Sequence, residues 1–237
     1  RPLWTPAPAP QTLTTWRDLA DDLLLTLADR GDDPVIAVGH SLGGVVSLIA
    51  ALTQPDRFRA LILLDPVILP PNVLRVMQRM QAADQMGAFP LVQGALRRRA
   101  RFATPDEAFA YWRSRPLFAD WTDAALRGYV TAGLVAEGEE WALRWSPDWE
   151  ARTFATGYTG SWRDLGRLRA VTPPIPTLLV RGETSDTLTR PCAERIAARC
   201  PHIDVRPIPG HGHLFPLSAP DATAALILDW LAKQRLL

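Results

Sequence analysis

The sequence contains little cysteine. Its 237 residues include two, Cys192 and Cys200. The residues between them have a helical pattern, and eight helical residues rise about 12 Å, which is too far for a disulfide to bridge. We therefore expect two reduced thiols, which favours a cytoplasmic location.

The sequence also lacks an excess of charge and a long apolar run. Its 26 basic and 25 acidic residues give a net charge of +1, so no overall field would attract nucleic acid or an anionic membrane. The basic run Arg97–Arg99 is interpreted as a solvated helix face. No apolar run approaches the ~20 residues that a membrane helix needs. We expect a small-molecule partner, no nucleic acid and no membrane span; oligomeric state is left open.

Apolar patterns alternate between short continuous runs and helical spacing. Helical spacing from Trp16 to Leu27 ends at Gly31, and the next run, 35–38, is typical of a strand covered on both faces. Such alternation predicts a mostly parallel, doubly wound α/β sheet with helices on both faces. Further strands are expected at 60–65, 177–180 and 203–208, and further helices at 45–53, 192–199 and 222–233.

The alternation is interrupted between the second and third predicted strands. Only helical and irregular patterns occur there, over a length far beyond an ordinary connection. We predict an inserted helical cap at 67–172, with the core formed by 1–66 and 173–237. The cap holds six of the nine tryptophans, which either line an apolar pocket or, as we favour for most of them, fill a small helical core.

A Gly-x-Ser-x-Gly motif stands where the first predicted strand turns into a helix. Ser41 lies between Gly39 and Gly43, and in this setting the turn pushes the serine hydroxyl out at the top of the sheet. The two glycines leave room for a strained turn. The following helix directs free N–H groups at the same place. A plain strand-to-helix turn with a capping serine is the structural alternative.

A nucleophilic serine needs a base, and the base needs a carboxylate that orients it. His211 and His213 lie in a loop directly after the last predicted strand, at the sheet edge where active sites of open α/β sheets form, and one of them is the expected base. Asp186, after the third strand, is the expected acid. Its rivals are Glu183 and Asp65, and each carboxylate could instead cap a turn.

These segments together resemble the α/β-hydrolase superfamily, in its serine-nucleophile branch that carries a cap. The resemblance rests on Gly39–Gly44, Gly182–Asp186 and Gly210–His213, in the order serine, acid, histidine. It implies His213 as the base, Asp186 as the acid and an α/β-hydrolase fold. A serine in the elbow argues against the dehalogenase and epoxide hydrolase branches, whose nucleophile is a carboxylate.

The resemblance further implies an oxyanion hole with two N–H donors. One should come from Leu42, and the other from a His-Gly loop that family members carry ahead of the helix near Thr14. Neither that loop nor the family's first strands occur in this sequence, which begins at Arg1 rather than Met. We expect the front strands, and any targeting signal, to lie outside the given chain.

The sequence favours a serine hydrolase that cleaves a small to medium carboxylic ester through an acyl-enzyme. The same residues would serve a lactone, thioester, amide or C–C bond hydrolase, or a perhydrolase without a cofactor. An alternative of another class is a non-catalytic, hydrolase-like module that binds a small molecule. No metal or organic cofactor is implied, and an apolar part of the substrate is suggested by the aromatic cap.

Overall fold

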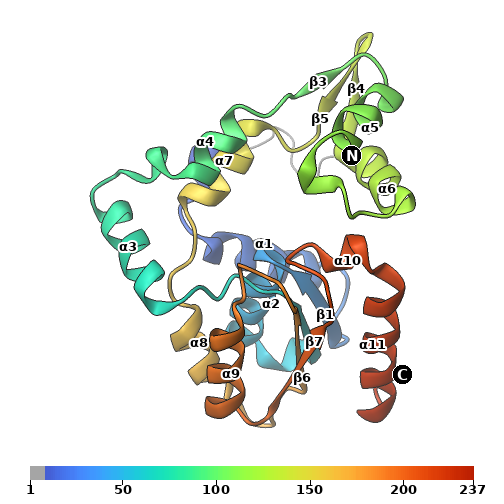
Figure 1. The fold of residues 1–237 in the computed structure, drawn as a ribbon. Helices are drawn as coiled ribbons and strands as arrows, with labels where there is room; N and C mark the ends of the chain where they lie inside the picture. The colour runs from blue at the N-terminus through green and yellow to red at the C-terminus, as the bar shows by residue number, and fades with distance from the viewer. Residues whose placement is uncertain (1–8) are drawn as a thin grey trace. The chain divides into compact units, whose positions relative to one another are not determined.

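The computed structural model describes residues 9–237, which form two compact units. The core unit consists of Trp16–Val76 and Tyr158–Leu237, and the second unit consists of Met77–Gly157 with the segment that ends at Thr15. Figure 1 labels the helices and strands of both units. Residues 67–76 and 158–172, which the sequence placed in the cap, belong to the core unit.

The core unit contains a four-stranded parallel sheet. Its order is β1-β2-β6-β7, and each neighbouring pair runs in parallel. The strands are Val35–His40, Phe58–Leu64, Thr177–Gly182 and Ile203–Ile208. The doubly wound α/β prediction is therefore confirmed, and every predicted strand is present. The central strands β2 and β6 are apolar runs buried almost throughout, whereas the edge strands β1 and β7 are only partly buried.

Helices cover both faces of this sheet, as expected. Figure 1 shows α8 and α9 on one side of the strands and α11 on the other. In β2, Leu61 and Leu63 pack with the first group of helices, whereas Ile62 and Leu64 pack with the second, which follows the two-residue period of a strand. The first group is α1 (Trp16–Ala28), α2 (Leu42–Thr53), α8 (Ser161–Leu168) and α9 (Arg190–Arg199); the second is α10 (Phe215–Ser218) and α11 (Pro220–Lys233).

Helix α8, the last helix of the range 67–172 that the sequence placed in the cap, belongs to the core unit for a clear reason. Its residues Leu165 and Leu168 are buried in the same cluster as α2 and the sheet. Trp162 donates its indole N–H to the carbonyl of Leu69, at 2.9 Å. Apolar burial and this bond attach α8 to the core unit. The boundary between the two units therefore follows side-chain packing and does not coincide with the start of the next strand.

Strand β1 differs from its predicted environment. Among residues 9–237 it pairs only with β2, and it forms the edge of the sheet. Val35, Ile36 and Ala37 are half-buried and Val38 is 56% exposed, so the expectation of a strand covered on both faces is wrong for the described residues. An apolar run indicates a strand, but its coverage depends on neighbours that the run itself does not reveal.

The second unit is not purely helical, which corrects the predicted helical cap. A small antiparallel sheet with the order β3-β5-β4 lies among its helices. Gly138, with φ at +64°, turns β4 into β5. Strands of two to four residues are too short to show a period, so no pattern in the sequence indicates them. The strands are Arg101–Phe102, Leu134–Glu137 and Glu140–Leu143; the helices are α4 (Pro90–Leu96), α5 (Pro105–Arg113), α6 (Asp123–Gly133) and α7 (Pro147–Ala155).

Short helical turns and one shared helix complete the described chain. Helix α3 (Pro71–Ala82) crosses the boundary between the two units. Single 3-10 turns occur at Pro10–Thr12, Pro55–Arg57, Met86–Ala88 and Pro116–Phe118.

Aromatic side chains fill the interior of the second unit. Trp112 is buried, and its ring lies 4.9–6.2 Å from the rings of Phe102, Phe118 and Tyr129. These contacts agree with the core interpretation of the aromatic residues. In the basic run, Arg97 and Arg99 are exposed, as expected, and Arg98 is half-buried and pairs with Glu150. The run follows the end of α4 at Leu96, so the expectation that it lies on a helix is wrong.

Two further expectations concern the cysteines and a membrane-spanning helix. Cys192 and Cys200 are free and buried, as predicted. Within residues 9–237, no helix has both the length and the apolar character needed to cross a membrane.

Candidate active site

Ser41 occupies the sharp turn between β1 and α2. Its φ of +56° lies in the left-handed region, a costly conformation for a residue with a side chain. Its hydroxyl makes no capping bond to α2, although Ser41 holds the N-cap position. The backbone of the turn therefore directs the hydroxyl away from the helix, as the motif predicts.

Close packing in this turn depends on Gly39 and Gly44 rather than on Gly43. A Cβ on Gly39 would overlap the carbonyl group of Gly43, and a Cβ on Gly44 would lie 3.0 Å from the Gly39 oxygen and from Pro66. A Cβ on Gly43 would meet nothing within 4 Å. The expectation that both motif glycines are required by crowding is correct for Gly39 and wrong for Gly43.

His213 contacts both Ser41 and a buried carboxylate. Its Nε2 lies 2.9 Å from Ser41 Oγ, and its Nδ1 lies 2.7 Å from Asp65 Oδ2. Because a carboxylate oxygen accepts, Nδ1 carries the proton and Nε2 is free to accept from the serine hydroxyl. His211 instead contacts Ser218 Oγ through Nδ1, at 2.9 Å.

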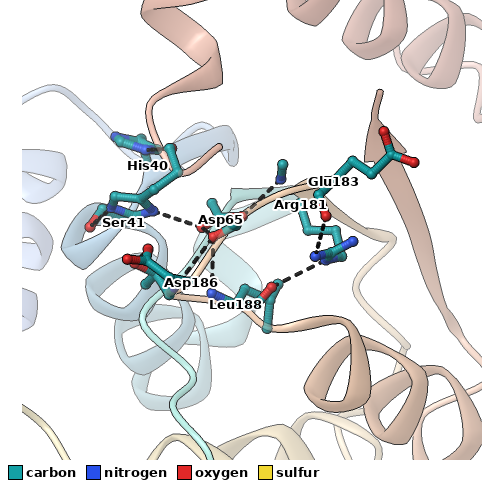
Figure 2. A network of polar contacts seen from close by, with 11 residues as sticks. His40, Ser41, Asp65, Arg181, Glu183, Asp186 and Leu188 are labelled. Atoms are coloured by element: carbon teal, nitrogen blue, oxygen red, sulfur yellow. Dashed lines mark hydrogen bonds and ion pairs between the residues drawn. The ribbon is translucent and has the colours of Figure 1, made fainter. Parts of the chain in front are cut away.

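Asp65 directly follows β2 and is fully buried. Its φ of +42° is a second left-handed conformation at the same sheet edge. Oδ1 accepts the backbone N–H of Gly182 at 2.9 Å, and Oδ2 accepts from Ser185 Oγ at 2.5 Å in addition to His213. Several of the dashed lines in Figure 2 meet at this residue. A buried carboxylate is tolerated where donors surround it in this way.

Asp186, the predicted acid, is not the partner of His213. It is exposed, and its Oδ1 accepts a bond from the Thr187 hydroxyl at 3.4 Å. In the described part of the chain no hydrogen bond joins Asp186 to His213, whereas Asp65, the rival at the end of β2, forms that bond. The loop after β6 turns residue 185 inward and residue 186 outward, and a loop has no period from which sequence could predict these directions.

Glu183, the other rival, serves the backbone. Its Oε2 accepts the N–H of Gly210 at 2.7 Å, which joins the loop after β6 to the loop that carries the histidines. A second close approach links the same two loops, because a Cβ on Gly182 would overlap the backbone of Gly212. Both loops are therefore held at one edge of the sheet.

His40 supports the histidine loop from the side. Its Nε2 lies 2.8 Å from the backbone oxygen of His213, and the two rings lie 4.8 Å apart. Burial lowers the pKa of His40, and the bond to the His213 carbonyl offsets part of this effect. Since a carbonyl oxygen accepts, Nε2 of the neutral ring carries the proton.

Leu42 begins α2, directly after the serine. The first N–H groups of a helix have no partner within the helix, and they carry the positive end of its dipole. The Leu42 N–H is therefore suited to hold negative charge that develops next to Ser41. Within residues 9–237, no group of three or more histidine, cysteine, aspartate or glutamate side chains is placed to hold a metal ion.

The site combines a serine in a strained elbow with a histidine and a buried carboxylate, all at the carboxyl ends of parallel strands. This combination is typical of hydrolases of the α/β class. The model of the alpha/beta hydrolase family matches residues 4–226 of this sequence. The chain belongs to the alpha/beta hydrolase family, and it is a hydrolase.

Individual relatives are distant or match only a part. The chain is 48% identical to Lipase LipV of Mycobacterium tuberculosis over 46 residues. These residues make up 19% of this chain and 18% of LipV. The chain is 22% identical to the abhydrolase domain-containing protein AKT2 of Alternaria alternata over 241 residues, 85% of this chain and 84% of AKT2. The crystal structure of E-2-(acetamidomethylene)succinate hydrolase shares the fold, with a TM-score of 0.70 and 22% identity over 92% of this chain and 74% of that one.

Proposed function

We propose that the protein is a serine hydrolase that cleaves small to medium carboxylic esters through an acyl-enzyme, with Ser41, His213 and Asp65 as its triad. The observation that carries this proposal is the continuous set of contacts from Ser41 Oγ to His213 Nε2 and from His213 Nδ1 to Asp65 Oδ2, at 2.9 and 2.7 Å. Both distances lie within the hydrogen-bond range that a nucleophile and its base require.

The first half of the reaction forms the acyl-enzyme. His213 Nε2 takes the proton of the Ser41 hydroxyl while Oγ attacks the ester carbonyl carbon. Asp65 holds the ring by its Nδ1–H and stabilises the imidazolium that forms. When the tetrahedral intermediate collapses, the C–O bond to the alcohol breaks, and His213 gives its proton to the departing alkoxide.

The second half releases the acid. His213 takes a proton from water, the resulting hydroxide attacks the acyl carbon, and the bond to Ser41 Oγ breaks as the proton returns to that oxygen. In both halves the carbonyl oxygen becomes negative. The Leu42 N–H is placed to stabilise that charge, an effect that typically contributes about a hundredfold or more in rate for one donor.

The ester class is supported by one local similarity. A relative that is 48% identical over 46 residues is named a lipase, and lipases act on carboxylic esters. Other acyl compounds remain alternatives on the same triad, so the substrate panel should include a short-chain ester, a lactone, a thioester and an amide. We expect the ester to give the largest kcat/KM.

Covalent labelling by a fluorophosphonate tests the proposed function directly. The probe should label the wild type at Ser41 and leave Ser41→Ala unlabelled, and ester hydrolysis should be lost with the label. His213→Ala should lose both as well, because the hydroxyl then has no base. Labelling that persists in Ser41→Ala would show that another residue is the nucleophile. A folded wild type that takes no label would overturn the assignment in favour of a binding module.

A further inference from the structure

Ser185 lies beside the acid of the proposed triad and has no role in the chemistry above. It is buried in the loop after β6, with its Oγ 2.5 Å from Asp65 Oδ2. We propose that Ser185 is a positioning residue that holds the Asp65 carboxylate in the orientation that His213 requires. This inference rests on the proposed function, because it concerns the acid of that triad.

The two oxygens of Asp65 are fixed separately. Oδ1 is held by the backbone N–H of Gly182, whereas Oδ2 receives both Ser185 and His213. Without the serine hydroxyl, the bond from His213 would be the remaining contact on Oδ2 among those that the structure describes. The carboxylate could then turn about its terminal bond, since such sp3–sp2 torsions are broad.

The direction of the Ser185 hydroxyl follows from its other partners. Its Oγ accepts the backbone N–H of Thr187 at 3.1 Å and that of Leu188 at 3.3 Å. Two donors occupy the lone pairs of the oxygen, which leaves its hydrogen for Asp65 Oδ2. Ser185 is thus a fixed donor, whose hydrogen has no competing acceptor in this arrangement.

Arg181 holds the loop that carries Ser185. Arg181 is buried, donates from Nε to the carbonyl of Leu188 at 3.1 Å, and donates from a terminal nitrogen to the carbonyl of Glu183 at 2.9 Å. Figure 2 shows these two bonds from Arg181 to Glu183 and Leu188. The two carbonyls come before and after Ser185 in the chain, so the bonds hold the loop on both sides of it. A buried network of this kind, with its members satisfied, favours one geometry.

The experiment compares Ser185→Ala with Ser185→Thr and Ser185→Cys, using kcat and KM for the best ester. Ser185→Ala should lower kcat by about 10- to 100-fold, the usual value of one hydrogen bond to a charged group, and leave KM within about twofold. Ser185→Thr keeps the hydroxyl and should restore most of the activity. Ser185→Cys keeps a side chain of similar size but replaces the hydroxyl by a thiol, which is a weak donor. If Ser185→Ala fails to fold, Ser185→Cys should still fold and should show a reduced kcat.

Asp186→Asn provides the matched control, because it changes the adjacent, exposed residue. It should retain wild-type kcat and KM. A double-mutant cycle adds the decisive readout. In an Asp65→Asn background, adding Ser185→Ala should lower kcat by less than about twofold, because the carboxylate that Ser185 positions is already absent.

The result that overturns the inference is wild-type kcat in folded Ser185→Ala, or equal costs of that change with and without Asp65→Asn. The fluorophosphonate label separates this failure from failure of the proposed function. If Ser41-dependent labelling and hydrolysis are intact while Ser185→Ala is neutral, the triad stands and the positioning role is wrong. If Ser41→Ala keeps its activity, both are wrong.

Discussion

Serine and threonine at the start of a helix act differently in the two units. In the second unit, Thr104, Thr122 and Ser146 each accept a backbone N–H from the first turn of their helices, at 3.0, 3.1 and 3.3 Å. In the core unit, Ser41 holds the same position before α2 and accepts none. Its hydroxyl lies 2.9 Å from the base His213 instead.

The backbone explains why Ser41 makes no cap, although Thr189 before α9 has an extended backbone and also makes no side-chain cap. The three capping residues have φ between −142° and −64° with extended ψ, the conformation that turns a side chain toward the helix. Ser41 has φ at +56°, which turns its side chain away. The same residue type therefore stabilises a helix in one unit. In the other it leaves the N–H groups of the helix free for charge that develops on a substrate.

The largest effect on stability is expected where the elbow is most crowded. Gly39→Ala should lower the free energy of unfolding by about 3 kcal/mol or more, because its Cβ would overlap the backbone of Gly43. Gly43→Ala, in open space at the start of α2, should leave stability unchanged or raise it by up to about 1 kcal/mol. Denaturant unfolding followed by circular dichroism measures both.

Equal losses for these two glycine variants would contradict this account of the elbow. They would show that the turn depends on the motif glycines alike, rather than on the one close approach between Gly39 and Gly43.

A smaller effect compares the two kinds of helix start. Thr104→Ala should cost about 1 kcal/mol of stability, because it removes the cap that accepts from Glu107. Ser41→Ala should change the free energy of unfolding by less than about 0.5 kcal/mol, since Ser41 makes no cap. Thermal or denaturant unfolding of the two variants provides the measurement. A cost of about 1 kcal/mol in Ser41→Ala would mean that its hydroxyl supports α2 after all.

The smallest effect is a pH dependence that comes from His40. Burial lowers its pKa below 6.5, so the unfolded chain binds a proton more readily and the folded state loses stability as the pH falls below about 6.5. In His40→Gln this loss is absent. The stability of the wild type relative to the variant should therefore be greatest above pH 7 and decrease toward pH 5. Unfolding midpoints at pH 7.5 and 5 measure it, and a pH-independent difference would exclude burial as the cause.

Much of this fold was predictable because its signals are local and long. Continuous apolar runs indicated three of the four parallel strands, and a strand followed by Gly39 and Ser41 indicated the elbow. The place of the loop after the last strand indicated His211 or His213 as the base, and the family resemblance selected His213. These features depend on residues adjacent in sequence, which a single chain displays directly.

The acid could not be derived in the same way. Asp65 and Asp186 both follow strands that end at the same sheet edge, so sequence position does not separate them. What separates them is direction: Ser185 turns inward and Asp186 outward, while a left-handed φ aims Asp65 at the histidine. The short strands of the second unit were missed for a related reason, since two to four residues show no period.

In the proposed triad, the carboxylate that orients His213 comes from the end of β2 rather than from the loop after β6. The most direct test is kcat/KM for the same ester with the matched pair Asp65→Asn and Asp186→Asn. The first change should lower kcat/KM by about 10³- to 10⁴-fold in a folded protein, because His213 loses the group that fixes its tautomer, and the second should leave it within about twofold. The reverse result, with Asp186→Asn inactive and Asp65→Asn active, would contradict the account.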